Sequence, residues 1–361
     1  MSALKILYDY PSFRQTHGGV SRYLCEIIKE LDGEIEAQMS IFLTDNIYIH
    51  EIPSLKVKRL LPYKRFKGKK RIERIFNTIY SNYKLKNSNY DIFHISNPDY
   101  YSVRKIKQPI VATIHDMVNE KLTEYHISHS VQIENKKRLI FDCAHLIAVS
   151  ENTKKDIIDI YAINPNKITV IHHGAPLPAK ERFKNNYGRY IFYVGDRERY
   201  KNFIFFTLSI APLLIEDRDL KLVCAGPSFT VEEEKFLVKL RVRNQVFAMR
   251  VSDSYLFSLY GNALAFVYPS RFEGFGIPIL EAFANSCPVC LSNSSCFPEI
   301  AGDAALYFDP EDSESIYKSV KEIISNTSLA FELKKKGLKR LAQFSWSKAA
   351  KETLNVYNTV I

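Results

Sequence analysis

One stretch of the sequence, residues 268–288, most constrains what this chain can fold into and bind. The apolar run Ala263–Tyr268 has the length of a buried strand, and Pro278 stands where the first turn of a helix accepts a proline. The loop between them contains glycines, which let backbone amides come close to a ligand, and the amides at a helix start favour phosphate oxygens. The expected anion-binding loop consists of Gly274, Phe275, Gly276 and Ile277.

Two glutamates bracket this loop. Glu273 precedes the first glycine, and Glu281 follows eight residues later inside the predicted helix. Because a carboxylate repels phosphate, we expect both to accept hydrogen bonds from hydroxyl groups at either end of a ligand. A ligand with hydroxyls, then phosphates, then hydroxyls again has the chemistry of a nucleotide sugar.

Length and composition indicate a globular chain of two domains. The chain has 361 residues, of which 46% are hydrophobic and 25% are charged, and this length suffices for two cores of ordinary size. The sequence contains neither an apolar run of about 18 residues or more nor a secretory signal pattern. We therefore expect a cytoplasmic protein that does not span a membrane.

The net charge of +10 is concentrated in one segment. The segment Lys56–Arg74 carries ten basic residues against one acid, Glu73, with leucine and aromatic side chains interleaved. This mixture suits an anionic membrane surface or an anionic lipid-linked substrate. The alternative is a solvated basic face without a partner, and no motif supports binding to nucleic acid.

The six cysteines fall mostly inside apolar runs, which is typical of small buried side chains in a reducing compartment. Cys287 and Cys290 form a CxxC pair, followed by Cys296. A fourth ligand at the spacing of a zinc site is missing, so we predict no metal site here.

The first half of the chain alternates apolar runs with helical patterns, which predicts a parallel sheet covered by helices. Ligands of such sheets lie at the carboxyl ends of the strands. Gly18 and Gly19 follow the first predicted strand and form a candidate phosphate or sugar contact, or else a tight turn without a ligand. His115 follows the strand Ile110–Ile114, where it would donate to a sugar hydroxyl or phosphate, or belong to a turn capped by its own backbone.

A second alternating series begins after an irregular, proline-containing stretch at 172–188, the best linker candidate in the chain. Arg197 and Lys201 lie in the loop after the predicted strand Tyr190–Val194. Two fixed cations at the end of a strand can neutralise a diphosphate, although two surface cations would give the same pattern. The Asp-Arg-Asp triplet at 217–219 formally matches a metal-binding motif of sugar transferases, but it precedes a strand, so we interpret it as a polar turn.

Taken together, these residues resemble the retaining glycosyltransferases of family 4. The signature glutamate pair appears in Glu-Gly-Phe-Gly-Ile-Pro-Ile-Leu-Glu-Ala at 273–282. Further matches are Gly-Gly-Val at 18–20, His-Asp at 115–116, Val-Ser-Glu-Asn-Thr at 149–153, Val-Gly-Asp-Arg at 194–197 with Lys-Asn at 201–202, and Pro-Glu-Ile-Ala-Gly-Asp-Ala-Ala at 298–305. The resemblance covers almost the whole chain.

The resemblance implies an α/β fold of the GT-B type, with two Rossmann-like domains whose parallel sheets face an interdomain cleft. The N-terminal, acceptor-side domain would span residues 1–176 and the nucleotide-sugar-binding domain residues 177–345. A C-terminal helix at 346–361 would cross back to the N-terminal domain.

The resemblance also assigns roles to the candidate residues. Arg197 and Lys201 would bind the donor diphosphate, and Glu281 would hold the ribose hydroxyls. Glu273, with the amides of residues 274–277, would meet the donor sugar. Gly18 and Gly19 would face the phosphates from the other domain, and His115 would contact the sugar near the reacting centre.

The expected reaction is metal-independent transfer of a sugar, with retention at the anomeric carbon, from a nucleoside diphosphate sugar that serves as co-substrate. GDP-mannose is the first donor to test, with UDP-sugars close behind. The acceptor would be a saccharide or lipid-linked saccharide of surface polysaccharide or lipopolysaccharide synthesis, with the enzyme peripheral on the inner face of the membrane. Two alternatives stay open here: a nucleotide-sugar epimerase on the same fold, and a non-catalytic membrane-bound scaffold.

Overall fold

The computed structural model describes residues 3–61, 66–97, 106–123, 130–178, 183, 186–197 and 199–361. The chain divides into two compact units, each of which is described by itself. Unit 1 comprises Met1–Gly174 and Ser345–Ile361, and unit 2 comprises Ala175–Phe344. Four residues of the basic segment predicted from the sequence, 62–65, lie outside the described residues.

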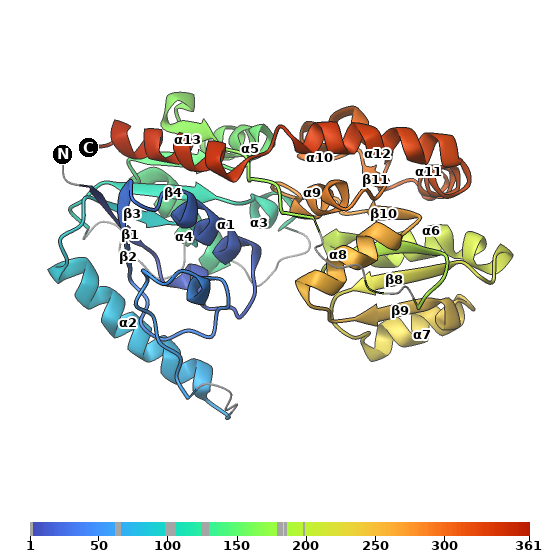
Figure 1. The fold of residues 1–361 in the computed structure, drawn as a ribbon, viewed down its shortest axis with the longest axis horizontal. Coiled ribbons are helices and arrows are strands. Elements are labelled where there is room, and N and C mark those ends of the chain that lie inside the picture. Colours follow the sequence, from blue (N-terminus) through green and yellow to red (C-terminus); the bar gives the residue numbers. More distant parts are fainter. Residues whose placement is uncertain are drawn as a thin grey trace. The chain divides into compact units, whose positions relative to one another are not determined.

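Unit 1 contains a six-stranded parallel sheet in the order β2-β1-β3-β4-β5-β6 within the described part of the chain (Figure 1). Its strands are β1 (Leu4–Tyr8), β2 (Ile35–Met39), β3 (Ile92–Ile95), β4 (Ile110–Ile114), β5 (His145–Ala148) and β6 (Ile168–Val170). The central strands β3 and β4 are buried throughout, as expected for a parallel sheet with both faces covered. The strand order reverses between β1 and β3, so a ligand is expected outside the carboxyl ends of these strands.

The structure describes several helices in unit 1, of which α2 lies along the outside of the unit (Figure 1). They are α1 (Gly19–Glu30), α2 (Lys69–Asn87), α3 (Val118–Lys121), α4 (Ser130–Asp142), α5 (Glu151–Tyr161) and α13 (Trp346–Thr359). The side chain of Ser150 accepts a hydrogen bond from the amide of Thr153 at 3.0 Å and so forms the N-cap of α5.

The C-terminal helix α13 packs on α1 within unit 1, although hundreds of residues separate the two helices in sequence (Figure 1). A buried polar network holds it there. The Tyr357 hydroxyl lies 2.6 Å from Nδ1 of His94 and 3.2 Å from the hydroxyl of Tyr8, and His94 also contacts Thr113. The network therefore fixes the end of the chain to the strands β1, β3 and β4.

Unit 2 contains a second six-stranded parallel sheet in the order β12-β11-β10-β7-β8-β9, again within the described residues. Its strands are β7 (Tyr190–Val194), β8 (Lys221–Ala225), β9 (Val246–Met249), β10 (Ala265–Tyr268), β11 (Val289–Ser292) and β12 (Leu306–Phe308). Numbered within the unit, this is the 3-2-1-4-5-6 order of a dinucleotide-binding sheet, and its switch point lies between β7 and β10.

The helices of unit 2 complete a core formed by the apolar side chains of the sheet and of α6 and α11. These helices are α6 (Phe203–Glu216), α7 (Val231–Lys239), α8 (Asp253–Asn262), α9 (Ile277–Ala284), α10 (Phe297–Ala301), α11 (Ser313–Ser325) and α12 (Thr327–Leu341). The short edge strand β9 and the five-residue helix α10 were not predicted from the sequence. β9 is only partly buried over Phe247–Met249, so its apolar pattern is weak.

Candidate active site

The loops that follow β7 and β10 lie at the switch point of unit 2, where a parallel sheet of this order binds its ligand. The backbone amide of Arg271, after β10, donates to the carbonyl of Tyr200, after β7, at 2.8 Å. Asn202 begins α6 in the left-handed conformation, and its buried side chain donates to the carbonyl of Pro310 at 2.9 Å. The first contact holds the two loops against each other, the second fixes the start of α6 to the segment after β12, and each loop carries predicted site residues.

Lys201 and Glu273, one from each loop, form the closest contact between predicted site residues. Lys201 Nζ lies 2.6 Å from Glu273 Oε1, and the two side chains are only 14% and 13% exposed. Burial alone would lower the pKa of Lys201, but the charge of Glu273 outweighs it and raises that pKa well above its ordinary value. The lysine is therefore a permanent cation that is neutralised by the carboxylate predicted to meet the donor sugar.

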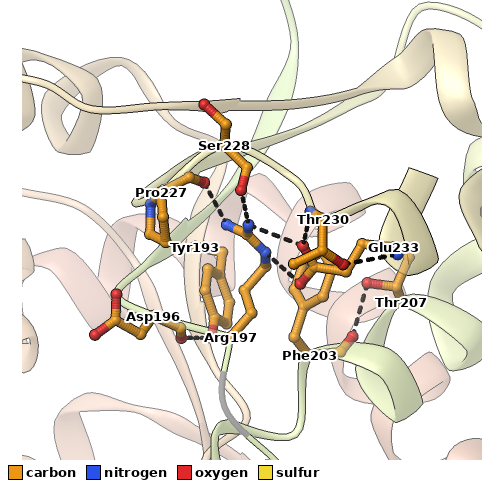
Figure 2. A network of polar contacts seen from close by, with 9 residues as sticks. All are labelled: Tyr193, Asp196, Arg197, Phe203, Thr207, Pro227, Ser228, Thr230 and Glu233. Carbon is orange, nitrogen blue, oxygen red and sulfur yellow. Dashed lines mark hydrogen bonds and ion pairs between the residues drawn. The ribbon is translucent and has the colours of Figure 1, made fainter.

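Arg197 lies in a different polar network, which Figure 2 shows. Its guanidinium donates from Nε and Nη2 to the two carboxylate oxygens of Glu233 at 2.7 and 3.0 Å. It also donates to the carbonyls of Pro227 and Ser228, both at 2.8 Å, and it packs over the ring of Phe229. The side chain is 3% exposed. Arg197 thus joins the loop after β7 to the loop between β8 and α7, and contact with a diphosphate would require it to give up some of these bonds.

No local pattern in the sequence indicates that Glu233 is the partner of Arg197. Glu233 belongs to a capping box at the start of α7: its side chain accepts from the amide of Thr230, whose hydroxyl accepts from the amide of Glu233. That local pattern is readable from the sequence. The pairing with an arginine 36 residues away depends on the tertiary structure.

The glycine loop leads directly into α9, as predicted. Gly276 is the N-cap of this helix and has φ +90°, a conformation that favours glycine. A Cβ atom there would also lie 3.0 Å from Ile279 and 3.2 Å from Phe297. The first turn of α9 contains a proline and no acid, so its positive dipole end is not compensated by a side chain of that turn.

Glu281 lies on α9 and is 6% exposed. Its carboxylate accepts a hydrogen bond from the hydroxyl of Tyr260, on α8, at 3.1 Å. Since the carboxylate is buried among apolar side chains, the tyrosine helps to keep it in one orientation. Tyr260 is a site-supporting residue that the sequence did not reveal.

In unit 1, Gly18 and Gly19 begin α1, and no side chain caps this helix start. Both glycines line a cavity of about 650 Å³. A smaller neighbouring cavity of about 240 Å³, lined by His115, shares Val20, Asn97 and Gln132 with it. The structure thus brings the predicted residues of unit 1 to two adjoining cavities at the carboxyl side of its sheet.

The imidazole of His115 is positioned by aromatic packing against Tyr23 and His173, whose ring centroids lie 5.2 and 5.7 Å away. Burial lowers the pKa of His115 to about 4, so the ring is neutral at physiological pH. Its Nε2 atom is buried and has no hydrogen-bond partner among the described residues. The neighbouring Asp116 caps the start of α3 through the amide of Val118, but His115 itself takes no part in that cap.

The other motifs of the sequence have structural roles. All six cysteines are buried and free, and burial raises the pKa of the Cys287 thiol to about 12. Asp217 closes a turn before β8, where it accepts from the amides of Asp219 and Leu220 and pairs with Arg189. In the described ranges, every helix is too short or too polar to cross a bilayer.

Comparison with known proteins decides the family. Residues 17–177 match the model described as "Glycosyltransferase Family 4", and residues 178–340 match that of "Glycosyl transferases group 1". The chain belongs to glycosyltransferase family 4. Similar curated proteins include O-antigen chain mannosyltransferase B of Escherichia coli, which is 27% identical over 98% of this chain and 99% of that protein. O-antigen chain mannosyltransferase RfbU of Salmonella typhimurium is 33% identical over 50% of this chain and 51% of its own length.

Solved structures of similar fold agree with this assignment. The lipopolysaccharide glycosyltransferase WaaG superposes with a TM-score of 0.74 at 14% identity, covering 98% of this chain and 99% of WaaG. Anabaena Alr3699/HepE in complex with UDP-glucose gives a TM-score of 0.73 at 14% identity, covering 98% and 100%. Together with the two parallel sheets, these matches confirm the two-domain α/β fold of the GT-B type that the sequence predicted. This family 4 member is therefore a glycosyltransferase.

Proposed function

We propose that the protein transfers a sugar, with mannose from GDP-mannose as the first donor to test, to a saccharide or lipid-linked saccharide of a surface polysaccharide. The printed names of the relatives support this choice, since several are mannosyltransferases and two of these act on O-antigen chains. A UDP-sugar is the second donor class, because structural neighbours were solved with UDP or UDP-glucose.

The observation that carries the proposal is the ion pair of Lys201 and Glu273 at the switch point. A donor diphosphate arriving there competes with Glu273 for the lysine ammonium, since both are anions. When the diphosphate takes Lys201, the carboxylate of Glu273 is released and can accept a hydrogen bond from a hydroxyl of the donor sugar. One exchange thus supplies a cation for the leaving group and an acceptor for the sugar.

The chemistry follows from where charge develops. As the glycosidic bond to the diphosphate breaks, negative charge grows on the phosphate and positive charge on the sugar ring. Lys201 and the start of α9 stabilise the former, and the loss of one such group typically lowers turnover about a hundred- to a thousandfold. Because these groups supply the positive field, we propose transfer without a resident metal or other cofactor. The acceptor hydroxyl would attack the anomeric carbon on the face from which the diphosphate departs, and the departing phosphate oxygen would accept its proton. Attack on that face gives retention at the anomeric carbon.

The remaining predicted residues keep supporting roles in this proposal. Glu281, oriented by Tyr260, accepts from the ribose hydroxyls. The neutral His115 uses its unpaired Nε2 toward the sugar near the reacting centre, and the start of α1 at Gly18 and Gly19 faces phosphate. Arg197 contributes its charge to the diphosphate site, and it also fixes the loop between β8 and α7.

We further propose that the enzyme works on an anionic membrane surface through helix α2. This helix lies along the outside of unit 1 (Figure 1), and its amphipathic pattern is inverted. Polar Asn77 and Ser81 are buried, whereas the apolar side chains Ile75, Phe76, Ile79 and Tyr83 share one face and are 50–64% exposed.

The exposed apolar stripe of α2 accompanies the basic segment predicted to meet a membrane. Exposed Arg71, in the first turns of α2, and exposed Lys67, just before the helix, belong to the described part of that segment. Lys69 does not contribute, because it is buried and pairs with Asp45 at 2.6 Å. An apolar stripe beside basic side chains suits the interface of a bilayer that contains anionic lipids.

Donor turnover tests the proposed function. The protein and its Lys201→Met variant are incubated with labelled GDP-mannose, UDP-glucose and UDP-galactose, with and without a lipid extract of a polysaccharide-producing bacterium. We expect one donor to label the extract, and the variant to do so at least about a hundredfold more slowly. No transfer from any donor would contradict the proposal, and release of an altered nucleotide sugar without acceptor would indicate an epimerase.

A further inference from the structure

The cavity of about 650 Å³ in unit 1 extends beyond the residues that the donor chemistry uses. One side is formed by the start of α1, with Gly18 and Gly19, and the opposite side by the first turns of α2. Its volume lies in the range of small-molecule sites. All residues that line it belong to unit 1 and to the described part of the chain.

The α2 side of this cavity carries concentrated positive charge. Lys70, Arg71 and Arg74 line it, and none of the three forms an ion pair with any residue that the structure describes. The nearby acid Asp45 is already engaged by Lys69 at 2.6 Å. Against these three cations the cavity lining holds one acid, Glu73, so the net charge on this side is positive and favours an anionic ligand.

The position of these cations on the helix strengthens this conclusion. They lie in the first turns of α2, whose dipole is positive at that end, and the first turn contains no acidic residue. Gly68, the N-cap, offers no side chain to the helix amides. Cations at a helix start are unfavourable, because they face the positive end of the helix dipole. A bound anion would reverse the sign of this interaction.

The cavity also presents an acceptor for a hydroxyl group. Glu73 lines the same side, and its Oε1 atom is buried without a hydrogen-bond partner among the described residues. The ammonium of Lys69 is 3.9 Å away from it, beyond hydrogen-bond distance. A ligand for this cavity therefore combines a multiply charged anion with at least one hydroxyl donor.

We propose that this cavity binds the acceptor, and that the acceptor carries a phosphate or diphosphate group joined to its sugar. The inference rests on the proposed glycosyl transfer and names the acceptor class for it. Arg71 and Arg74 match the bidentate geometry of phosphate oxygens, Lys70 adds a third charge, and Glu73 accepts from a sugar hydroxyl. A neutral saccharide would leave the net positive charge of this side without a counter-ion.

The test compares acceptors that differ only in charge. A disaccharide acceptor is supplied as the free sugar, as its soluble 1-phosphate, and as the diphosphate ester of a short polyprenol, with the donor that the enzyme turns over. We expect kcat/KM for both phosphorylated forms to exceed that for the free sugar at least about a hundredfold. If only the polyprenyl form is preferred, the lipid and not the phosphate raises kcat/KM, and the proposal is overturned. Equal kcat/KM for all three acceptors also overturns it.

Variants then identify the side chains that recognise the phosphate group of the acceptor. Arg71→Gln and Arg74→Gln are each expected to lower kcat/KM for the sugar 1-phosphate about tenfold or more, with little change for the free sugar. Lys86→Gln, in the last turn of the same helix, is the matched control and should change neither value. If the arginine variants instead weaken GDP or UDP binding and leave the acceptor preference intact, the cations serve the donor and the proposal fails.

A binding measurement separates this proposal from the proposed function. If the wild-type enzyme transfers no sugar from any donor, the proposed function has failed, but the cavity is still testable by titration calorimetry with mannose 1-phosphate. Binding that disappears in a Lys70→Gln, Arg71→Gln, Arg74→Gln variant, with thermal unfolding unchanged, supports the anion site. No binding of mannose 1-phosphate by the wild-type protein overturns it.

Discussion

Replacing Glu273 with glutamine should have opposite effects on nucleotide binding and on catalysis. In the structure, Glu273 forms an ion pair with Lys201, the lysine that the diphosphate is proposed to bind. Glutamine keeps the size of the side chain and can still accept a hydrogen bond, but it removes the negative charge. The variant should therefore bind a nucleoside diphosphate more tightly while it transfers sugar more slowly.

The magnitude follows from the contact itself. A hydrogen bond between charged groups contributes about 1.5–3 kcal/mol, and the 2.6 Å contact between two side chains that are 14% and 13% exposed belongs to this class. In the variant, a nucleoside diphosphate no longer has to displace the carboxylate of Glu273 from Lys201. Its binding free energy therefore becomes more favourable by up to this amount, which corresponds to a dissociation constant lower by about tenfold to a hundredfold. The variant also lacks the negative charge of Glu273, which repels the diphosphate, and this loss strengthens nucleotide binding further.

Titration calorimetry with GDP and UDP at fixed ionic strength measures this effect. Glu311→Gln is the matched control, because Glu311 belongs to the same unit but pairs with Arg271 and is 63% exposed; we expect less than about a threefold change for it. The transfer rate of Glu273→Gln should fall by at least about a hundredfold. Unchanged or weaker nucleotide binding by Glu273→Gln would refute the exchange of Glu273 for the diphosphate.

Three further outcomes are expected. Tyr260→Phe leaves the buried carboxylate of Glu281 with one hydrogen bond fewer, so urea unfolding should show a loss of about 1–3 kcal/mol; full stability would mean that the tyrosine contributes nothing. Ile75→Ser combined with Ile79→Ser should weaken binding to phosphatidylglycerol vesicles at least about tenfold in a sedimentation assay, whereas Ile215→Ser, an exposed isoleucine on α6, should not; equal binding by both would exclude α2 as the contact. His115→Gln should gain stability relative to the wild type as pH falls from 6.5 to 4, because burial lowers the pKa of His115 to about 4 and only the unfolded wild-type chain takes up that proton in this window; a pH-independent difference in unfolding free energy would contradict this.

The fold, and the position expected for the candidate site, followed from patterns that are local in the sequence. Strands such as β4 and β7 are continuous apolar runs, and the residues directly after them must lie at the carboxyl edge of a parallel sheet. This geometry alone places Lys201 and His115 where a ligand is expected. The left-handed conformation of Gly276 is likewise expected, because this glycine lies in a loop directly before a predicted helix start.

The partners of these residues could not be predicted, because they are set by contacts between distant segments. Arg197 and Glu233 are 36 residues apart, and Lys201 and Glu273 are 72 residues apart. The basic segment shows the same limit: charge counting gave Lys69 the same weight as its neighbours, yet Lys69 is buried against Asp45. Composition identifies a charged segment, and only the tertiary structure shows which charges are neutralised.

The central claim is retaining sugar transfer from a nucleoside diphosphate donor. It is tested most directly by NMR of the purified product together with quantification of the nucleoside diphosphate released. An α-linked GDP-mannose donor and a phosphorylated acceptor should give one GDP for each new α-glycosidic bond, and none of this product with Lys201→Met at matched time. A β-linked product, or free mannose released without any acceptor glycosylation, would contradict the account.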